Sequence, residues 1–247
     1  MTHPDLFGSE QSGDGGIRGV AVGIVTDNQD PKDLGRVKLQ FPWRDADDES
    51  YWARVATEMA GNEYGTYFLP EVEDEVLVAF ENGDIHRPFV IGSLWNGKQK
   101  PPQKNSDGKN NTREVRSRSD HKIAFDDSDK GSITIQTSAG NEIVIDDSGD
   151  SETIVVRDEK NDNSLAIDSG SGSVKVDAKK EIELSAQNIK INGKKSVKIT
   201  GNKGIKVASK GQMKLSSKAK LDIKSSGLMS VNATGPLQIK GALIQLN

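Results

Sequence analysis

Residues 174–247 repeat a period of eight, reading VKVDAKKE, IELSAQN, IKINGKKS, VKITGNKG, IKVASKGQ, MKLSSKAK, LDIKSSGL, MSVNATGP and LQIKGALI before the final residues. The first and third places of every octad are apolar, and the fifth is always Ala, Gly or Ser. One seven-residue step interrupts the period, between Ile182 and Ile189. The first place holds Val174, Ile182, Ile189, Val197, Ile205, Met213, Leu221, Met229 and Leu237. A period this regular predicts a stacked repeat architecture.

Each octad is predicted to be one β-strand followed by one corner. Successive side chains of a strand point to opposite faces, so places one and three share a dry face while place two faces water. The small fifth residue marks a corner where a bulky side chain would clash or where a positive φ is needed. The predicted strand corners are Gly193, Gly201, Ser209, Ser217, Ser225, Ala233 and Gly241.

Three intertwined chains would give every octad strand a neighbouring strand on both sides, which one coiled chain would not. A single chain with three octads per coil would form only about three coils with both ends open, which is a marginal stack. If three identical chains wind round one axis, every strand is flanked by strands of the other two chains. Such a needle would rise ~4.8 Å per octad, roughly 43 Å in all. Its predicted trimer core is Ile189, Ile191, Val197, Ile199, Ile205, Val207, Met213, Leu215, Leu221, Ile223, Met229, Val231, Leu237 and Ile239.

Composition and charge divide the chain into two halves of different construction. Only 33% of the residues are apolar, mean hydropathy is −0.61, and every aromatic residue lies between Phe7 and Phe125. Residues 174–247 hold 15 Lys and 4 acidic residues (net +11), against 18 basic and 33 acidic residues elsewhere (net −15). A basic stretch suits nucleic acid or an anionic membrane surface. Lysines also keep a β-rod soluble and its edges unpaired, and we favour that role.

The sequence carries no sign of disulfides, a signal peptide or a membrane span. Cysteine is absent, so neither disulfides nor cysteine-ligated zinc can hold the fold. The N-terminal residues MTHPDLFGSEQSGDGG lack the apolar core of a signal peptide, and no stretch approaches the ~20 apolar residues of a transmembrane span. We therefore expect synthesis in the cytoplasm without a signal peptide.

Ahead of the needle, the sequence predicts four segments, beginning with a flexible lead over residues 1–17. Residues 18–97 contain short alternating apolar runs separated by turn signals, which predict an all-β domain closed into a small barrel. Residues 98–120 include Pro101-Pro102 and a run of Lys, Asn and Asp, and are predicted to be an extended linker without regular structure. Residues 121–173 alternate again at a wider spacing, as in a wide β-helix or β-prism. Their apolar pairs are Ile123 and Phe125, Ile133 and Ile135, Ile143 and Ile145, Ile154 and Val156, and Leu165 and Ile167.

The barrel segment resembles a known family. DLGRVKLQFPW (33–43), ARVATEMAG (53–61) and GTYFLPEVEDEVLVAFENGDIHRPFVIGSLWNG (65–97) are similar to the OB-fold of the central spike of contractile injection systems. That fold is shared by phage baseplate assembly protein V and the VgrG proteins of type VI secretion. The resemblance runs from about Gly19 to Gly97 and continues through RSRSDHKIAFDD (116–127) into the repeats, in the family's order. The expected fold class is therefore all-β, an N-terminal OB-fold barrel followed by an intertwined trimeric β-helix.

The resemblance implies a homotrimeric, membrane-puncturing spike at the tip of the tube of a contractile tail. Only about seventeen residues precede the barrel, so the baseplate hub is expected to be a separate protein at the OB end. No lysozyme domain is inserted, and no His follows His121, which excludes the His-x-His iron site of some family needles. The apolar tip, LQIKGALIQLN, is expected to seat a PAAR-type protein on Leu243, Ile244, Leu246 and Asn247. Such a protein is assembled into the baseplate of a virion or phage tail-like particle and delivered into the target envelope.

No catalytic, cofactor or metal site is predicted. Trp43, Trp52, Tyr67 and Phe68 are interpreted as core and trimer contacts because the barrel half is acidic, whereas nucleic-acid grooves are basic. His86 is given a structural role. Asp126-Asp127 and Asp146-Asp147 lie in Gly-rich turns, where Asp is a good turn former, and are interpreted so rather than as acid/base pairs or calcium ligands.

Two other functions remain open at this point. A trimeric β-helical adhesin or tailspike that binds surface polysaccharide would need aromatic platforms and paired catalytic acids; the shaft has no aromatic residue from Asp126 onward, and its acid pairs are interpreted as turn formers. A nucleic-acid binder led by the Lys-rich needle would show steeply salt-dependent affinity. We favour a mechanical, non-enzymatic spike.

Overall fold

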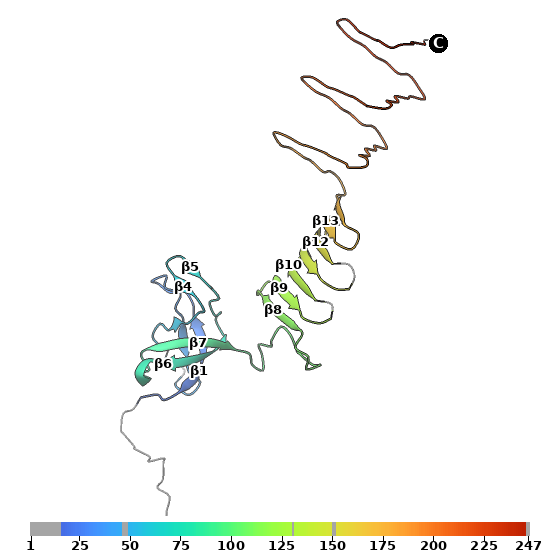
Figure 1. Cartoon of the computed structure of the whole chain (residues 1–247). Helices are drawn as coiled ribbons and strands as arrows, with labels where there is room; N and C mark the ends of the chain where they lie inside the picture. Colours follow the sequence, from blue (N-terminus) through green and yellow to red (C-terminus); the bar gives the residue numbers. More distant parts are fainter. Residues whose placement is uncertain (1–15, 46–48, 130, 150–151, 246–247) are drawn as a thin grey trace, which may run out of the picture. The chain divides into compact units, whose positions relative to one another are not determined.

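The computed structural model describes residues 16–45, 49–129, 131–149 and 152–245. The chain divides into two units, Met1–Ile182 and Glu183–Asn247. The first unit contains a barrel and a long sheet, and the second is an extended chain (Figure 1). Among the described residues no helix has the length and apolar character that crossing a membrane requires. The all-β fold class is confirmed, and within the described ranges the only helical element is the 3-10 turn η1, Glu81–Gly83.

A five-stranded sheet curls into the predicted barrel. The strand order is β2-β1-β6-β7-β3, with β3 parallel to β7 and every other neighbour antiparallel. Val37 and Ala53 join the two edges of this sheet, exchanging backbone hydrogen bonds of 3.0 and 2.7 Å. A small hairpin, β4-β5, extends from the barrel. The bounds are β1 Val20–Asp27, β2 Lys38–Gln40, β3 Arg54–Val55, β4 Ala60–Gly61, β5 Tyr64–Gly65, β6 Glu75–Phe80 and β7 Pro88–Leu94.

The barrel buries its own hydrophobic core. β6 shows the expected alternation, with Val76, Val78 and Phe80 buried and the residues between them half-buried. The Phe80 ring packs on Phe41 with centroids 5.5 Å apart. The full core cluster is Val25, Val37, Leu39, Phe41, Ala53, Val76, Val78, Phe80 and Val90.

Of the four barrel aromatics interpreted as core and trimer contacts, three do not lie in this core, and their role as trimer contacts stays a prediction. Trp43, Tyr67 and Phe68 are exposed, whereas Trp52 is half-buried beneath the side chains of Arg36 and Lys38. The interior is filled instead by Val and Leu side chains and two Phe rings, because a small barrel has room for few large aromatics.

A buried carboxylate holds the loop between β1 and β2. Asp30 accepts hydrogen bonds from the backbone N–H groups of Lys32 and Leu34, both at 3.0 Å. The Arg36 guanidinium adds two bonds to the same carboxylate, at 2.8 and 2.6 Å. These bonds, above all the one from Arg36, hold the pKa of Asp30 well below its usual range. The loop therefore depends on an ionised Asp30.

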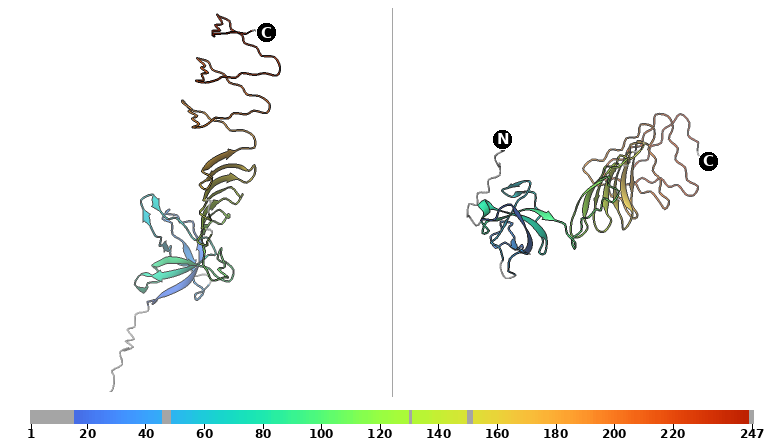
Figure 2. Two further views of the ribbon diagram at one scale, coloured as in Figure 1. Left: turned by 45° about the vertical axis from the view of Figure 1, so that its right-hand side comes forward. Right: turned by 90° about the horizontal axis from the view of Figure 1, so that it is seen from below.

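Seven antiparallel strands form a second sheet in simple chain order (Figures 1 and 2). Each strand is about five residues long and is joined to the next by a short turn. The bounds are β8 Thr112–Arg116, β9 Lys122–Asp126, β10 Ser132–Gln136, β11 Glu142–Asp146, β12 Thr153–Asp158, β13 Asn163–Asp168 and β14 Ser173–Asp177. The sheet thus uses one strand for each of the predicted wide repeats.

The sheet extends past both predicted boundaries. β8 lies inside residues 98–120, so the expectation that this whole segment lacks regular structure is wrong. Val174 and Val176, expected to open the needle, lie in β14 and pair with Ile167 and Leu165. The octad pattern and the wide repeats both begin with an apolar pair, so the sequence alone does not show where one gives way to the other.

The second unit, by itself, is an extended chain that winds in open turns (Figures 1 and 2). Its described residues form no strand and no backbone–backbone hydrogen bond. The chain bends directly after each fifth place, at residues 194–195, 202–203, 210–211, 218–219, 226–227 and 234–235. The eight-residue period is therefore present in the backbone as well as in the sequence.

Replacing Asp30 with Asn should destabilise the barrel at neutral pH. The folded pKa of Asp30 is depressed, so its contribution is present above the unfolded-state pKa near 3.8 and is lost as pH falls through the folded pKa. We expect Asp30→Asn to lower the midpoint of thermal unfolding by several degrees at pH 7, and the deficit to shrink from about pH 4.5 to pH 2.5.

Fluorescence measures this change selectively, because Trp43, Trp52 and Trp95 are all in the barrel segment. Glu81→Gln, which removes only an exposed pair with Arg87, is the matched control and should change the midpoint little. An equal loss in both variants, or a deficit that does not depend on pH, would contradict the role of Asp30.

Candidate functional site

One face of the β8–β14 sheet is apolar and uncovered by its own chain. Cross-strand pairs align apolar residues, for example Ile133 opposite Phe125 on one side and Ile145 on the other. The row continues through Ile154 and Ile167. We call this set the apolar sheet face; it comprises Val115, Ile123, Phe125, Ile133, Ile135, Ile143, Ile145, Ile154, Val156, Leu165, Ile167, Val174 and Val176.

Burial along these strands is the reverse of that in a protein core. Residues of the apolar sheet face are 37–66% exposed, whereas the residues that alternate with them are mostly half-buried. A contiguous apolar surface that spans seven strands far exceeds the scattered apolar residues of a normal protein exterior. The apolar sheet face is therefore an interaction surface.

The octads continue this exposed apolar pattern. From Ile182 onward, residues at the first place are 47–57% exposed and those at the third place 65–73%. All fourteen residues predicted as trimer core belong to these two groups, and none of them is buried by its own chain. The consistent difference between the two places shows that successive octads repeat one local conformation.

The fifth-place residues lie where the chain folds most tightly. A Cβ built on Gly193 would collide with the carbonyl oxygen of Ser196 and lie 2.9 Å from Val197 Cγ2. The same holds at Gly201, with Gly204 O and Ile205 Cγ1. None of the described corner residues has a positive φ. At Gly193 and Gly201 a small residue is therefore required by the close approach of the chain, and not by a positive φ.

Serine at the fifth place ties the corner together. The Ser217 hydroxyl donates to the carbonyl of Lys220 at 2.9 Å, and Ser209 makes the equivalent bond to Gln212 at 3.4 Å. The Ser209 and Ser225 hydroxyls also accept from the N–H groups of Gly211 and Gly227, both at 3.2 Å. Each of these three serines replaces a backbone partner that the open corner lacks.

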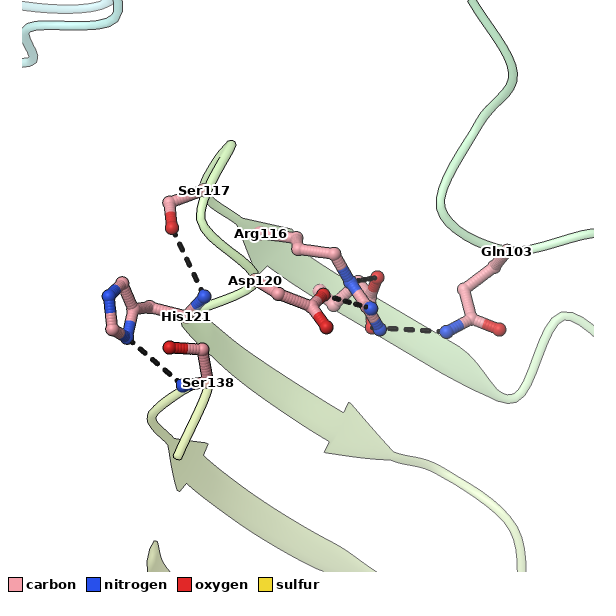
Figure 3. A network of polar contacts seen from close by, with 7 residues as sticks. Gln103, Arg116, Ser117, Asp120, His121 and Ser138 are labelled. Atoms are coloured by element: carbon pink, nitrogen blue, oxygen red, sulfur yellow. Dashed lines mark hydrogen bonds and ion pairs between the residues drawn. The ribbon is translucent and has the colours of Figure 1, made fainter. Parts of the chain in front are cut away.

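Side-chain acceptors link successive turns along one edge of the sheet. His121 Nδ1 accepts a hydrogen bond from the N–H of Ser138 at 3.2 Å (Figure 3). Asn141 and Asn163 make the same kind of bond to the N–H groups of Glu159 and Lys179, at 3.2 and 2.9 Å. His121, like the two asparagines, thus accepts a backbone N–H from a later turn, with Nδ1 as the acceptor nitrogen.

A polar network closes the first hairpin of the sheet. The Glu114 carboxylate, 3% exposed, accepts from Arg116 at 2.8 Å and from Gln103 at 3.0 Å (Figure 3). Arg116 also pairs with Asp120 at 2.6 Å. The Arg116 guanidinium holds the pKa of Glu114 below its usual range, so the carboxylate stays ionised and engaged. The network has the character of a structural clamp.

The acidic turns are also occupied structurally. Asp126 and Asp146 accept hydrogen bonds from the N–H groups two residues later, at 2.9 and 2.7 Å, as the turn-forming interpretation predicts. Asp127 forms an ion pair with Arg113. Among the described residues, no three His, Asp or Glu side chains cluster as a metal site would need.

The barrel carries a second uncovered surface. Leu34, Met59, Tyr64, Tyr67 and Phe68 are all exposed and line one open groove beside the β4-β5 hairpin. Sequence reasoning interprets Tyr67 and Phe68 as core and trimer contacts and does not predict this groove. The available signal was that these residues lie in a Gly-flanked hairpin and loop, outside the alternating runs that form the barrel strands.

Two predicted sites remain to be placed. His86 Nδ1 lies 2.9 Å from Asp84 Oδ1, and its ring packs edge-on against Tyr51 with centroids 5.2 Å apart. At the C-terminal end, Leu243 and Ile244 are exposed, and Leu246 and Asn247 lie outside the described residues.

The barrel segment matches a known family. Residues 21–95 match the model described as the type VI secretion system/phage-baseplate injector OB domain. The type VI secretion system spike protein VgrG3 of Vibrio cholerae is 39% identical over 83 residues, 32% of this chain and 8% of that protein. The spike protein VgrG5 of Pseudomonas aeruginosa is 44% identical over 72 residues, 28% of this chain and 9% of that protein.

A further relative shows how limited the matched part is. The actin cross-linking toxin VgrG1 of Vibrio cholerae is 38% identical over 72 residues, 28% of this chain and 7% of that protein. The matched segment thus spans less than a tenth of the length of these three relatives. The recognised likeness to injector spike proteins is confirmed for this N-terminal part of the chain.

Gly201→Val should disturb the octad fold more than a valine beside it. The new side chain would meet Gly204 O and Ile205 Cγ1, and such overpacking costs about 1–3 kcal/mol per site. We expect the midpoint of β-structure loss, followed by far-UV circular dichroism, to fall by at least about 5 °C. Asn202→Val, one residue along in the exposed bend, is the matched control. Equal midpoints for the two variants would refute the close-approach explanation.

Proposed function

We propose that this chain, whose residues 21–95 form an injector OB domain, is the spike subunit of a contractile injection system and works as a homotrimer. Three copies would bring their apolar sheet faces together as a three-sided shaft. Their octad segments would wind round the same axis as a needle. The work of such a spike is mechanical: it punctures a membrane by being stiff.

The uncovered apolar surface is the observation that carries this proposal. Burying a large apolar side chain contributes about 1.5–3 kcal/mol, and these side chains are roughly half exposed in their own chain. A few octads therefore match the 5–15 kcal/mol that holds an ordinary domain together. An isolated chain forgoes this stabilisation and also leaves the described backbone of the second unit without backbone–backbone hydrogen bonds.

Three chains supply what one chain lacks. Strands of two other chains can flank each octad strand and pair with its free N–H and C=O groups. The open turns of the extended unit are the path that a chain wound with others follows (Figure 1). Mutually wound chains cannot leave one at a time, so the assembly should unfold slowly and resist bending.

The partners follow from the two kinds of unit. The OB domain would attach to a separate hub protein of the baseplate, and the exposed aromatic groove beside β4-β5 offers an apolar surface for protein contact. At the other end, Leu243, Ile244, Leu246 and Asn247 would seat a PAAR-type tip protein. Assembly would take place in the baseplate of a virion or phage tail-like particle, and the spike would reach the target envelope on contraction.

Catalysis is not part of the proposal. In the described turns of the sheet, Asp126 and Asp146 accept backbone hydrogen bonds and Asp127 pairs with Arg113, and the shifted pKa values of Glu114 and Asp168 are shifted downward by hydrogen bonds. General acid catalysis would need a carboxyl pKa raised toward neutrality. Toxin activity in the name of VgrG1 belongs to that protein, of which this chain matches 7%.

Molar mass and one pair of adjacent substitutions test the proposal. Light scattering of the full chain should give roughly three times 26.7 kDa in native buffer. Ile199→Asp places a charge in the proposed core and should abolish or severely weaken the trimer. Lys198→Asp changes the neighbouring residue, on the opposite side of the strand, and should leave the trimer intact. A monomeric wild-type protein, or equal effects of the two variants, would overturn the trimeric spike.

A further inference from the structure

Lysines crowd one part of the needle, which we call the lysine collar, residues 189–224. This segment holds eleven Lys, one Asp and no Arg. Every residue of the lysine collar is exposed, and only Lys220 has a carboxylate partner there, Asp222 at 2.9 Å. Toward the tip the charge stops: Lys240 is the only charged side chain after Lys224.

The density of this charge exceeds what solubility requires. In the proposed trimer the lysine collar carries a net charge of about +30 over some 22 Å, since nine half-octads climb ~2.4 Å each. That is roughly one charge per 0.7 Å, against one per ~1.7 Å in duplex DNA. A rod this highly charged recruits polyanions strongly, as DNA recruits polycations.

The position of the lysines keeps them available to a ligand. Lys190, Lys198, Lys206 and Lys214 occupy the second place of four successive octads, which points away from the apolar first and third places. We call these four residues the lysine column. It ends at Asp222, and the later second places are Ser230 and Gln238.

The position of the lysine collar behind the end of the chain that follows Lys224 indicates which kind of polyanion it binds. A partly apolar end whose one charged side chain is Lys240, with a cationic zone behind it, matches the layers of a membrane from its interior outward, hydrocarbon and then phosphate. Nucleic-acid binding usually adds aromatic stacking, and no aromatic residue follows Phe125. Lysine without arginine also fits a diffuse phosphate layer, because Lys acts as a point charge whereas Arg recognises phosphate by a fixed two-bond geometry.

We infer that the lysine collar binds the phosphate groups of an anionic membrane surface once the end beyond Lys224 has entered the membrane. The inference rests on the proposed trimer, which sets the charge density. Each lysine near an anionic surface contributes favourably, and its alkyl stem can lie along apolar surface while the ammonium reaches the phosphates.

Vesicle flotation of the full chain tests this inference. The protein is mixed with vesicles of phosphatidylcholine and phosphatidylglycerol at 3:1, or of phosphatidylcholine alone, at about 50 and 500 mM salt. Replacing the lysine column by Gln (Lys190→Gln, Lys198→Gln, Lys206→Gln, Lys214→Gln) should weaken binding to the anionic vesicles at least tenfold. A control with the same charge change, Lys98→Gln, Lys100→Gln, Lys104→Gln and Lys109→Gln, should bind within about twofold of wild type.

The outcomes separate this inference from the proposed function. Binding that needs anionic lipid, weakens at high salt and is lost only in the lysine-column variant supports the lysine collar. Failure of a protein that scatters as a trimer to bind anionic vesicles overturns the lysine collar and leaves the spike standing. Duplex DNA that displaces the vesicles at a tenfold lower phosphate concentration also overturns it, in favour of nucleic acid. A monomeric mass contradicts the spike itself.

Discussion

Much of this chain is organised round apolar side chains that nothing in the chain covers. In the β8–β14 sheet the alternation of residues is regular, yet the apolar set lies on the open side and the polar set is the better covered. The octads repeat the arrangement without any strand pairing of their own. The sheet has defined turns and strand registers, and the octads have defined corners, but neither region encloses a hydrophobic core of its own. In the proposed spike, the stability and function of the repeats depend on covering these faces.

The barrel, unlike the repeats, buries its own apolar side chains. Its sheet closes on itself through Val37 and Ala53, buries Phe41 and Phe80, and holds the β1–β2 loop with an ionised Asp30. In the proposed spike, the barrel has a hydrophobic core of its own and would serve as an attachment domain. The repeats would gain a core only in the trimer and would transmit force along its axis. Polar side chains in the repeats, among them His121, Asn141 and Ser217, fix turns and corners rather than forming a reactive centre.

Periodicity predicted most of this organisation, and its failures have physical causes. Alternating runs identified the barrel and the wide repeats, and the small fifth residues identified corners that the backbone shows as bends. The size and apolarity of a side chain do not show which way it points, so they do not distinguish core from contact surface for Trp43, Tyr67 and Phe68, which are exposed outside the barrel's alternation. β8 was missed because TREVR has a single apolar residue, Val115, and is held by the Glu114–Arg116 clamp and by pairing with β9. Ordering of such a strand comes from tertiary contacts, which composition does not record.

In the proposed trimer, the third-place side chain of an octad points into an interior shared by the three chains, and the second-place side chain points to solvent. The chain contains no cysteine, so introduced cysteines can test this directly. Single cysteines are introduced at Leu215, a third place, and at Lys214, a second place, and the dilute protein is mildly oxidised. Leu215→Cys should form disulfide-linked pairs of chains rapidly, because the third places of neighbouring chains meet near the axis and a disulfide needs Cα atoms within about 7 Å. Lys214→Cys should remain largely uncrosslinked under the same conditions. Equal cross-linking at the two positions, or none at Leu215, would contradict the account.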